Sequence, residues 1–265
     1  MAKILTLLAI VLSCLPGRAG ASEPPEVVAA LAPGGRLRAA INFGNPVLAQ
    51  KDPDSGQPRG ISVDLARELA KRLDVQLDFV TFDGAGKVFD ALKTNAWDVA
   101  FLAIDPVRAS EIEFTPPYVM IEGTYLVPAD STLTSIGDFD RSGIRIAVGR
   151  GSAYDLYLSR TLKLAQLVRA PTSAAAIGLF QSEKLEAAAG VKQPLVEAAS
   201  KEPGLRVIPG RFMAIEQAMG TPRGRTAAAA YLQAFIEEMK ASGFVARALA
   251  ASGQDDATVA PAMSR

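Results

Sequence analysis

A short apolar run that ends before a proline limits the folds open to this chain more than any other stretch. Residues 98–103 read Asp-Val-Ala-Phe-Leu-Ala, a pattern typical of a parallel strand buried on both faces of a sheet. Pro106 follows, so Arg108 is expected near the carboxyl end of the strand, where open α/β sheets bind small ligands. A guanidinium there can hold a carboxylate through two parallel hydrogen bonds, although position alone would also suit a solvated loop arginine.

Strands and helices alternate before this run. Strands are predicted at Leu37–Phe43 and, from alternating apolar residues, at Val75–Phe79. Apolar residues at helical spacing predict a helix over Ser62–Leu73 with Ser62 as its cap, and a second helix over Val88–Ala96. This order predicts a parallel sheet with right-handed crossovers.

A second α/β unit follows an extended segment that ends at a proline. Gly123–Pro128 is interpreted as a hinge strand, Ile144–Val148 as the first strand of the new unit, and Phe212–Met219 as a second extended crossing. The unit is completed by helices over Ala153–Leu164 and Thr172–Ser182, a helix opened by Pro194, and strands at Leu185–Ala189 and Leu205–Ile208. Two helices, Thr226–Gly243 and Phe244–Ser252, end the predicted fold.

The first 21 residues are typical of a secretory signal peptide, with an early lysine, a short apolar run and a small-residue exit at Ala21. The single cysteine, Cys14, lies inside this leader, so we expect a mature chain without thiols. Lipidation at Cys14 is the less favoured alternative, because the cysteine comes early and Leu12 is unusual before it. The mature chain would carry 26 basic and 28 acidic residues, a net charge of −2 that makes nucleic acid an unfavoured partner.

The chain contains no histidine. This removes the commonest general base and metal ligand, so histidine triads and familiar zinc sites are excluded, and no metal or cofactor is predicted. Catalysis by carboxylates or lysine stays open.

Several motifs together resemble one family. They are Gly60–Leu65, Trp97–Ala100, Arg108 with Phe114–Tyr118, and Glu237–Phe244. From about residue 37 to residue 250 the chain resembles the type II periplasmic solute-binding proteins of polar amino-acid ABC transporters, the bacterial extracellular solute-binding family 3. The resemblance implies an α/β fold of two lobes joined by two hinge strands, with lobe 1 formed by residues 22–126 and 216–265 and lobe 2 by residues 127–215.

The resemblance also implies binding residues. Arg108 falls where the family binds the α-carboxylate of the ligand, and Ser152 falls where the second lobe offers a hydroxyl and helix N–H groups to the same carboxylate. Ala103, at the end of the apolar strand, is assigned to the same site. Asn42 and Asn45 lie in the first loop, where they face the ligand side chain or serve only as turn residues.

The sequence departs from the family at the group that holds the ligand ammonium. Val191 stands where an aspartate is usual, and the glycine-rich residues 84–86 replace a usual aromatic residue. Because an enclosed ammonium without a counter-charge is costly, we expect either a small organic anion or an amino acid held by Asp105, Glu122 or Glu216. Asp105, which replaces a usual threonine, would alternatively orient Arg108.

The resemblance favours a periplasmic, monomeric receptor that delivers an amino acid or a related small carboxylate to a membrane ABC permease. The runner-up is an enzyme on the same scaffold, similar to cyclohexadienyl or prephenate dehydratases, with Asp105, Glu122 or Glu216 as acid or base. A receptor sensing domain ranks last, because no spanning helix is visible after Ser252. As a loop residue, Arg108 is expected to contribute little to the core.

Overall fold

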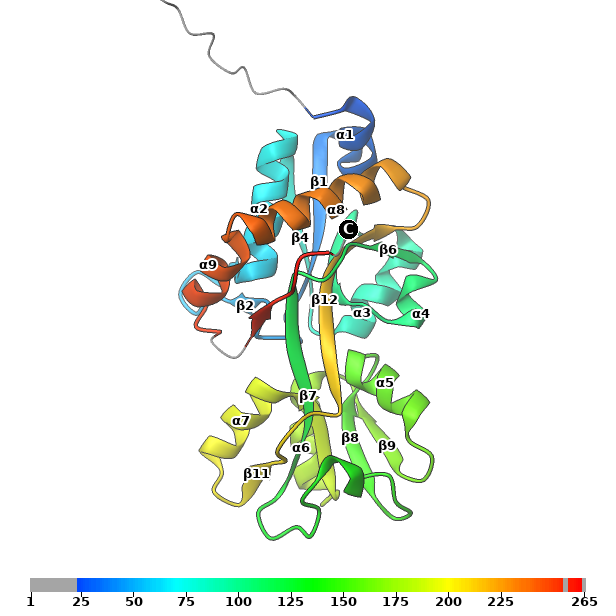
Figure 1. The fold of residues 1–265 in the computed structure, drawn as a ribbon, viewed down its shortest axis with the longest axis vertical. Coiled ribbons are helices and arrows are strands. Elements are labelled where there is room, and N and C mark those ends of the chain that lie inside the picture. The colour runs from blue at the N-terminus through cyan, green and yellow to red at the C-terminus, as the bar shows by residue number, and fades with distance from the viewer. Residues whose placement is uncertain (1–22, 255–256, 264–265) are drawn as a thin grey trace, which may run out of the picture.

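The computed structural model describes residues 23–254 and 257–263; the expected signal peptide and Cys14 lie outside them. The molecule is elongated and has two lobes (Figure 1), as the sequence predicts. We call the lobe with β1, β4 and β5 lobe 1 and the lobe with β8, β9 and β10 lobe 2. Two long antiparallel strands run from one lobe into the other, β7 (Val119–Pro128) and β12 (Met213–Pro222).

One sheet is continuous through both lobes, in the strand order β4-β1-β5-β12-β7-β10-β8-β9. In lobe 1 its parallel strands are β1 (Arg36–Asn42), β4 (Gln76–Phe82) and β5 (Val99–Ala103). In lobe 2 they are β8 (Arg145–Gly149), β9 (Gln166–Ala170) and β10 (Ala187–Val191). The short strands are β2 (Gln50–Lys51), β3 (Pro58–Arg59), β6 (Ile112–Phe114), β11 (Leu205–Val207) and β13 (Thr258–Val259).

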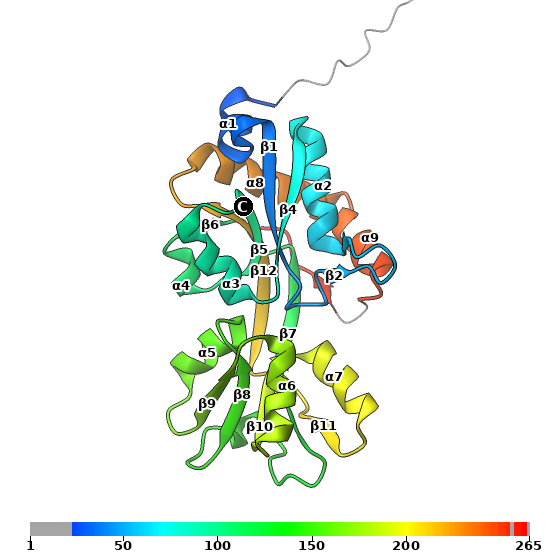
Figure 2. The ribbon, with the colours of Figure 1, turned by 180° about the vertical axis from the view of Figure 1, so that it is seen from behind.

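Helices cover the sheet in each lobe (Figures 1 and 2). Those of lobe 1 are α1 (Pro25–Leu31), α2 (Ile61–Leu73), α3 (Ala85–Asp90), α4 (Pro106–Ala109), α8 (Thr226–Ala241) and α9 (Phe244–Ala251). Those of lobe 2 are α5 (Ala153–Thr161), α6 (Ser173–Ser182) and α7 (Lys192–Lys201). Short 3-10 helices span Pro33–Gly35, Ala91–Thr94 and Ile136–Asp138. No helix among the described residues is long and apolar enough to cross a membrane.

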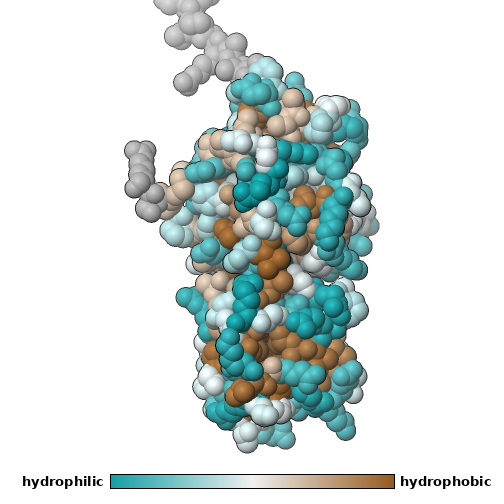
Figure 3. Space-filling model, turned by 90° about the vertical axis from the view of Figure 1, so that its right-hand side faces the viewer, coloured by the Kyte–Doolittle hydropathy of each residue, from teal (hydrophilic) through white to brown (hydrophobic). Residues whose placement is uncertain are grey.

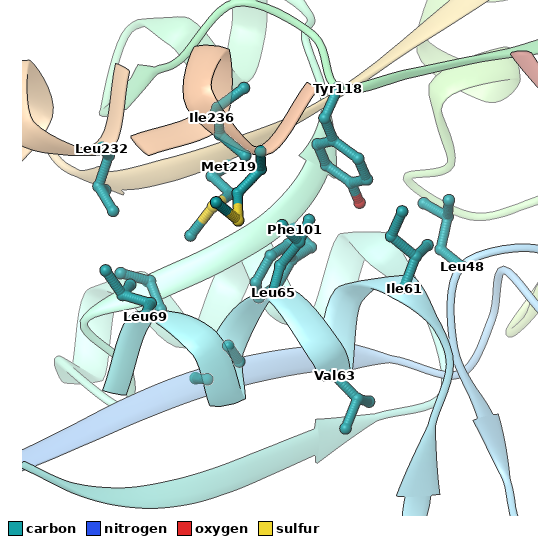
Figure 4. Packing of buried hydrophobic residues seen from close by; sticks show 14 of the residues in the cluster. Leu48, Ile61, Val63, Leu65, Leu69, Phe101, Tyr118, Met219, Leu232 and Ile236 are labelled. Atoms are coloured by element: carbon teal, nitrogen blue, oxygen red, sulfur yellow. The ribbon is translucent and has the colours of Figure 1, made fainter. Parts of the chain in front are cut away.

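Alternate residues of the central strands pack on opposite faces of the lobe 1 sheet. Ala39 and Phe101 belong to the large cluster under α2 and α8, whereas Ala40 packs on the other face with Val88 and Trp97. Figure 4 shows the large cluster, in which Phe101 meets Tyr118 edge to face at a centroid distance of 6.3 Å. Burial on both faces explains why residues 98–103 read as an apolar run.

Lobe 2 is smaller and packs two clusters, one on each face of its sheet. Leu126, Ala147 and Ala188 face α6, while Val127 and Ile146 face the opposite cluster. On the face of the molecule shown in Figure 3, hydrophobic residues gather mainly in the middle and lower part of the view, between hydrophilic side chains.

Local details differ from the sequence prediction. Ser62 does not cap α2, because Gly60 occupies the cap position and Ser62 is buried with its Oγ 3.2 Å from the Tyr118 hydroxyl. The helix expected over Val88–Ala96 leaves α geometry after Asp90 and stops at a left-handed Asn95. The sequence prediction missed α1, α4, β6, β9 and the two-residue strands β2, β3 and β13. It placed β10 two residues too early, and α7 begins at Lys192 and not at Pro194.

Candidate functional site

The carboxyl ends of the parallel strands in the two lobes face a common cleft. A small pocket with a volume of about 30 Å³ lies there, and we call it the polar pocket after Arg108, Asn45 and Ser152 in its wall. Of the residues predicted for the site, the structure brings six to its wall and leaves out Asp105; the six are Asn42, Asn45, Ala103, Arg108, Ser152 and Val191.

Arg108 is fully buried and bridges the two lobes. It lies in the single turn α4, which starts at Pro106, so the expectation of a loop arginine outside the core is wrong. Its Nη1 donates to the carbonyl of Ala103 at 2.9 Å, and its Nη2 donates to the carbonyl of Gly151 in lobe 2 at 2.8 Å. Its Nε–H has no partner among the described residues. Burial lowers the pKa of Arg108 to about 10, against the opposing effect of Asp105, so the guanidinium is charged at neutral pH.

Ser152 caps α5 at the edge of lobe 2. Its Oγ accepts a hydrogen bond from the Asp155 backbone N–H at 3.0 Å, and its side chain is almost completely buried. Ser152 therefore acts as an ordinary helix cap and also lines the pocket. The α5 N-terminus adds partial positive charge opposite Arg108.

Asn42, the last residue of β1, and Asn45, in the loop that follows, differ in their contacts. Asn42 accepts a hydrogen bond from the Gly44 backbone N–H at 2.9 Å, which is a turn contact. Asn45 is buried, and its Oδ1 has no partner in the described part of the chain. Asn45 and Arg108, which both line the pocket, thus hold an unpaired acceptor and an unpaired donor.

Asp105 lies beside the pocket and contacts lobe 2. Its carboxylate caps α4 through the Val107 N–H at 2.9 Å and accepts a hydrogen bond from Arg160 Nη2 at 2.7 Å. No hydrogen bond joins it to Arg108 among the described contacts. The structure thus engages Asp105 in an ion pair between the lobes.

Glu122 and Glu216 also lie outside the pocket walls. Hydrogen bonding to Lys192 and, more weakly, to Arg211 lowers the pKa of Glu122 despite partial burial. Glu216 is exposed because side chains alternate along β12, which turns Ile215 and Gln217 into the pocket. The sequence analysis did not predict Ile215 and Gln217 as pocket residues. The alternation of side chains along a strand would have placed them on the face opposite Glu216.

A larger cavity of about 550 Å³ adjoins the polar pocket, and Gly44, Tyr154, Ser173 and Val191 line both. It was not predicted from sequence. Burial raises the pKa of the Tyr154 phenol, so this hydroxyl is neutral in the wall between the two cavities. Among the described residues, no group of three His, Cys, Asp or Glu side chains could hold a metal ion.

A profile of the bacterial extracellular solute-binding proteins, family 3, matches residues 37–251. The glutamine-binding protein of Geobacillus stearothermophilus is 24% identical over 123 residues, which cover 44% of this chain and 46% of that protein. The match therefore spans less than half of this curated relative.

Solved structures show the same type II two-lobe fold at low identity. A mutant of ArgBP from T. maritima has a TM-score of 0.73 and 21% identity, covering 86% of this chain and 100% of that one. The cysteine-binding protein of Campylobacter jejuni has a TM-score of 0.74 and 18% identity, and the match covers 86% of this chain and 96% of that one. The ancestral amino acid-binding protein AncCDT-1, a precursor of cyclohexadienyl dehydratase, has a TM-score of 0.69 and 22% identity. This match covers 82% of this chain and 95% of that one.

Proposed function

Because the chain belongs to the bacterial extracellular solute-binding proteins of family 3, we propose that it captures an amino acid or a related small carboxylate between its lobes and delivers it to an ABC permease. The proposed protein is a periplasmic monomer secreted through residues 1–21. Its lobe boundaries are proposed at residues 126/127 and 215/216, inside β7 and β12.

The buried guanidinium of Arg108 carries this proposal. A charged group without full hydrogen bonding is costly in a protein interior, and a carboxylate that accepts from it removes that cost. Arg108 also contacts both lobes, so an anion bound beside it is placed to favour closure over opening. Hinge closure of this kind is a common way to sequester a small ligand.

Binding fits the site better than catalysis does. A general acid or base must come within hydrogen-bonding reach of the reacting group. None of the three acids considered for such a role, Asp105, Glu122 and Glu216, lines either cavity of the cleft. The site therefore supports reversible binding of a ligand.

The test is a thermal-shift screen of the purified mature chain against the 20 amino acids and a set of small carboxylates. A ligand at about 100 times its Kd stabilises the native state by about 2.7 kcal/mol, which corresponds to a shift of about 5–10 °C. Arg108→Ala is expected to abolish the shift. The absence of any shift across the whole panel would contradict the proposal.

A further inference from the structure

The two cavities of the cleft suit different parts of one ligand. The polar pocket, at about 30 Å³, has room for about two water-sized groups. The adjoining cavity, at about 550 Å³, lies within the ordinary size range of ligand sites. Since they share a wall, polar atoms of a head group can enter the first, while the carbon skeleton and a larger body occupy the second.

The larger cavity is lined mainly by apolar groups. Ala174, Ile177 and Gly178 share one face of α6 and form its floor, since residues three and four apart on a helix lie together. Leu195 and the lobe 1 residue Phe43 also line it. This wall suits a branched or aromatic hydrocarbon body.

The charges of the cleft select an anion. Arg108 is the cation of the polar pocket, and α5, α6 and α7 begin at the carboxyl ends of β8, β9 and β10, next to the two cavities. Each helix start adds partial positive charge. No acid lines the polar pocket among the residues that the structure describes, and Asp83, the acid in the larger wall, pairs with Lys87 at 2.7 Å. The polar pocket itself therefore offers a ligand ammonium no carboxylate.

The unpaired polar atoms indicate which group accompanies the carboxylate. Arg108 Nε–H is a donor without a partner, and Asn45 Oδ1 is an acceptor without a partner. Both side chains are more than nine-tenths buried in the wall of the polar pocket. A carboxylate satisfies the donor, and a neutral hydroxyl satisfies the acceptor without bringing a positive charge.

We propose that the ligand is a 2-hydroxy acid with a branched or aromatic body, its carboxylate on Arg108, its hydroxyl on Asn45 and its body along α6. This assignment rests on the proposed function and narrows its ligand class. It predicts that replacing an ammonium by a hydroxyl on the same carbon skeleton strengthens binding.

Isothermal titration of the mature chain with leucine, 2-hydroxyisocaproate and 4-methylpentanoate tests the head group. We expect the hydroxy acid to bind at least tenfold more tightly than leucine and about fivefold more tightly than the acid without the hydroxyl. Phenylalanine, phenyllactate and 3-phenylpropionate repeat the comparison with an aromatic body. Tighter binding of the amino acids would overturn this inference and leave the proposed function standing. Absence of binding by every amino acid and carboxylate would overturn both.

Gly178→Leu tests the cavity. A Cβ at Gly178 meets no atom within 4 Å, so a leucine fits on α6 and occupies the space of the ligand body. We expect at least tenfold weaker binding of 2-hydroxyisocaproate and a change below twofold for lactate, whose methyl group is too small to reach the cavity. Gly137→Leu, at an exposed glycine with equal space elsewhere in lobe 2, is the matched control. Equal affinities of wild type and Gly178→Leu for 2-hydroxyisocaproate would overturn the cavity assignment.

Discussion

Arg160 of α5 donates a hydrogen bond from Nη2 to Asp105 Oδ2 across the cleft, at 2.7 Å. Asp105 is almost completely buried, whereas the arginine side chain is 41% exposed. The pair joins the two lobes at the edge of the site, so it contributes only when the lobes are closed.

Arg160→Gln is therefore expected to weaken ligand binding without unfolding either lobe. A partly exposed ion pair contributes about 1 kcal/mol, which corresponds to about fivefold in Kd. Titration calorimetry measures the change, and Asp105→Asn in the Arg160→Gln background should add little. The control Lys201→Ala breaks an ion pair with Glu197 inside α7 and should leave Kd unchanged. Additive effects of the two cleft substitutions would contradict the coupling.

A second prediction concerns two glycines that touch between the lobes. A Cβ at Gly86 would lie 3.0 Å from the Arg150 carbonyl oxygen and 3.2 Å from the Gly151 Cα. Gly86→Val is expected to hold the lobes apart and weaken ligand binding about tenfold, since overpacking typically costs 1–3 kcal/mol. Small-angle scattering with saturating ligand should give a larger radius of gyration than wild type. Gly84→Val, at an extended position with no neighbour within 4 Å, should behave as wild type.

Arg108→Ala is expected to affect both binding and stability. The ligand carboxylate loses its charged partner, which should weaken binding at least 100-fold. The carbonyls of Ala103 and Gly151 also lose a donor, so unfolding in urea should show a loss of about 2 kcal/mol. The exposed Arg223, which also donates to a backbone carbonyl, that of Ala109, provides the control variant Arg223→Ala. Unchanged ligand affinity in Arg108→Ala would rule out the site.

Acid sensitivity should depend on Asp98, which is buried beside Arg38 and Arg225. Burial alone would raise the pKa of Asp98, but hydrogen bonds from the two arginines outweigh it and hold this pKa below the ordinary value of 3.8. The carboxylate therefore contributes stability above about pH 4, and that contribution is lost as the pH falls through the lowered pKa.

Asp98→Ala should cost about 3 kcal/mol in urea unfolding at pH 7 and less at pH 3, which lies below the ordinary pKa of 3.8. Asp78→Ala, which removes an exposed partner of Arg36, should cost less than about 1 kcal/mol. Equal losses for Asp98→Ala at both pH values would contradict the electrostatic explanation.

Local sequence patterns and the family resemblance were sufficient to predict the fold and part of the site. The apolar run at β5 and the alternation of strands and helices predict two α/β units, because burial on both faces of a parallel sheet leaves a direct sequence signal. The family resemblance implied that these units form two lobes joined by two hinge strands. Pro106 at the end of that strand places Arg108 near the carboxyl edge of the sheet, and the family resemblance assigned it to the binding site. Ser152 was assigned to the site by the family resemblance and not by a local pattern.

Contacts between distant segments could not be predicted in the same way. The burial of Arg108 depends on Gly151, 43 residues away, and the pairing of Asp105 depends on Arg160 in the other lobe. The large cavity arises where α6, α7 and the first loop of lobe 1 meet, so no single segment encodes it. Ser62 was misassigned because its spacing suits a cap, although tertiary packing places it against Tyr118.

The two crossing strands have a mechanical consequence. Near the N-terminus α1 packs on α8, and near the C-terminus β13 pairs with β7 at Met120, so both ends of the described chain attach to lobe 1. Tension applied between α1 and β13 would load lobe 1 first. Lobe 2 is inserted between β7 and β12, so it carries no load until lobe 1 has unfolded.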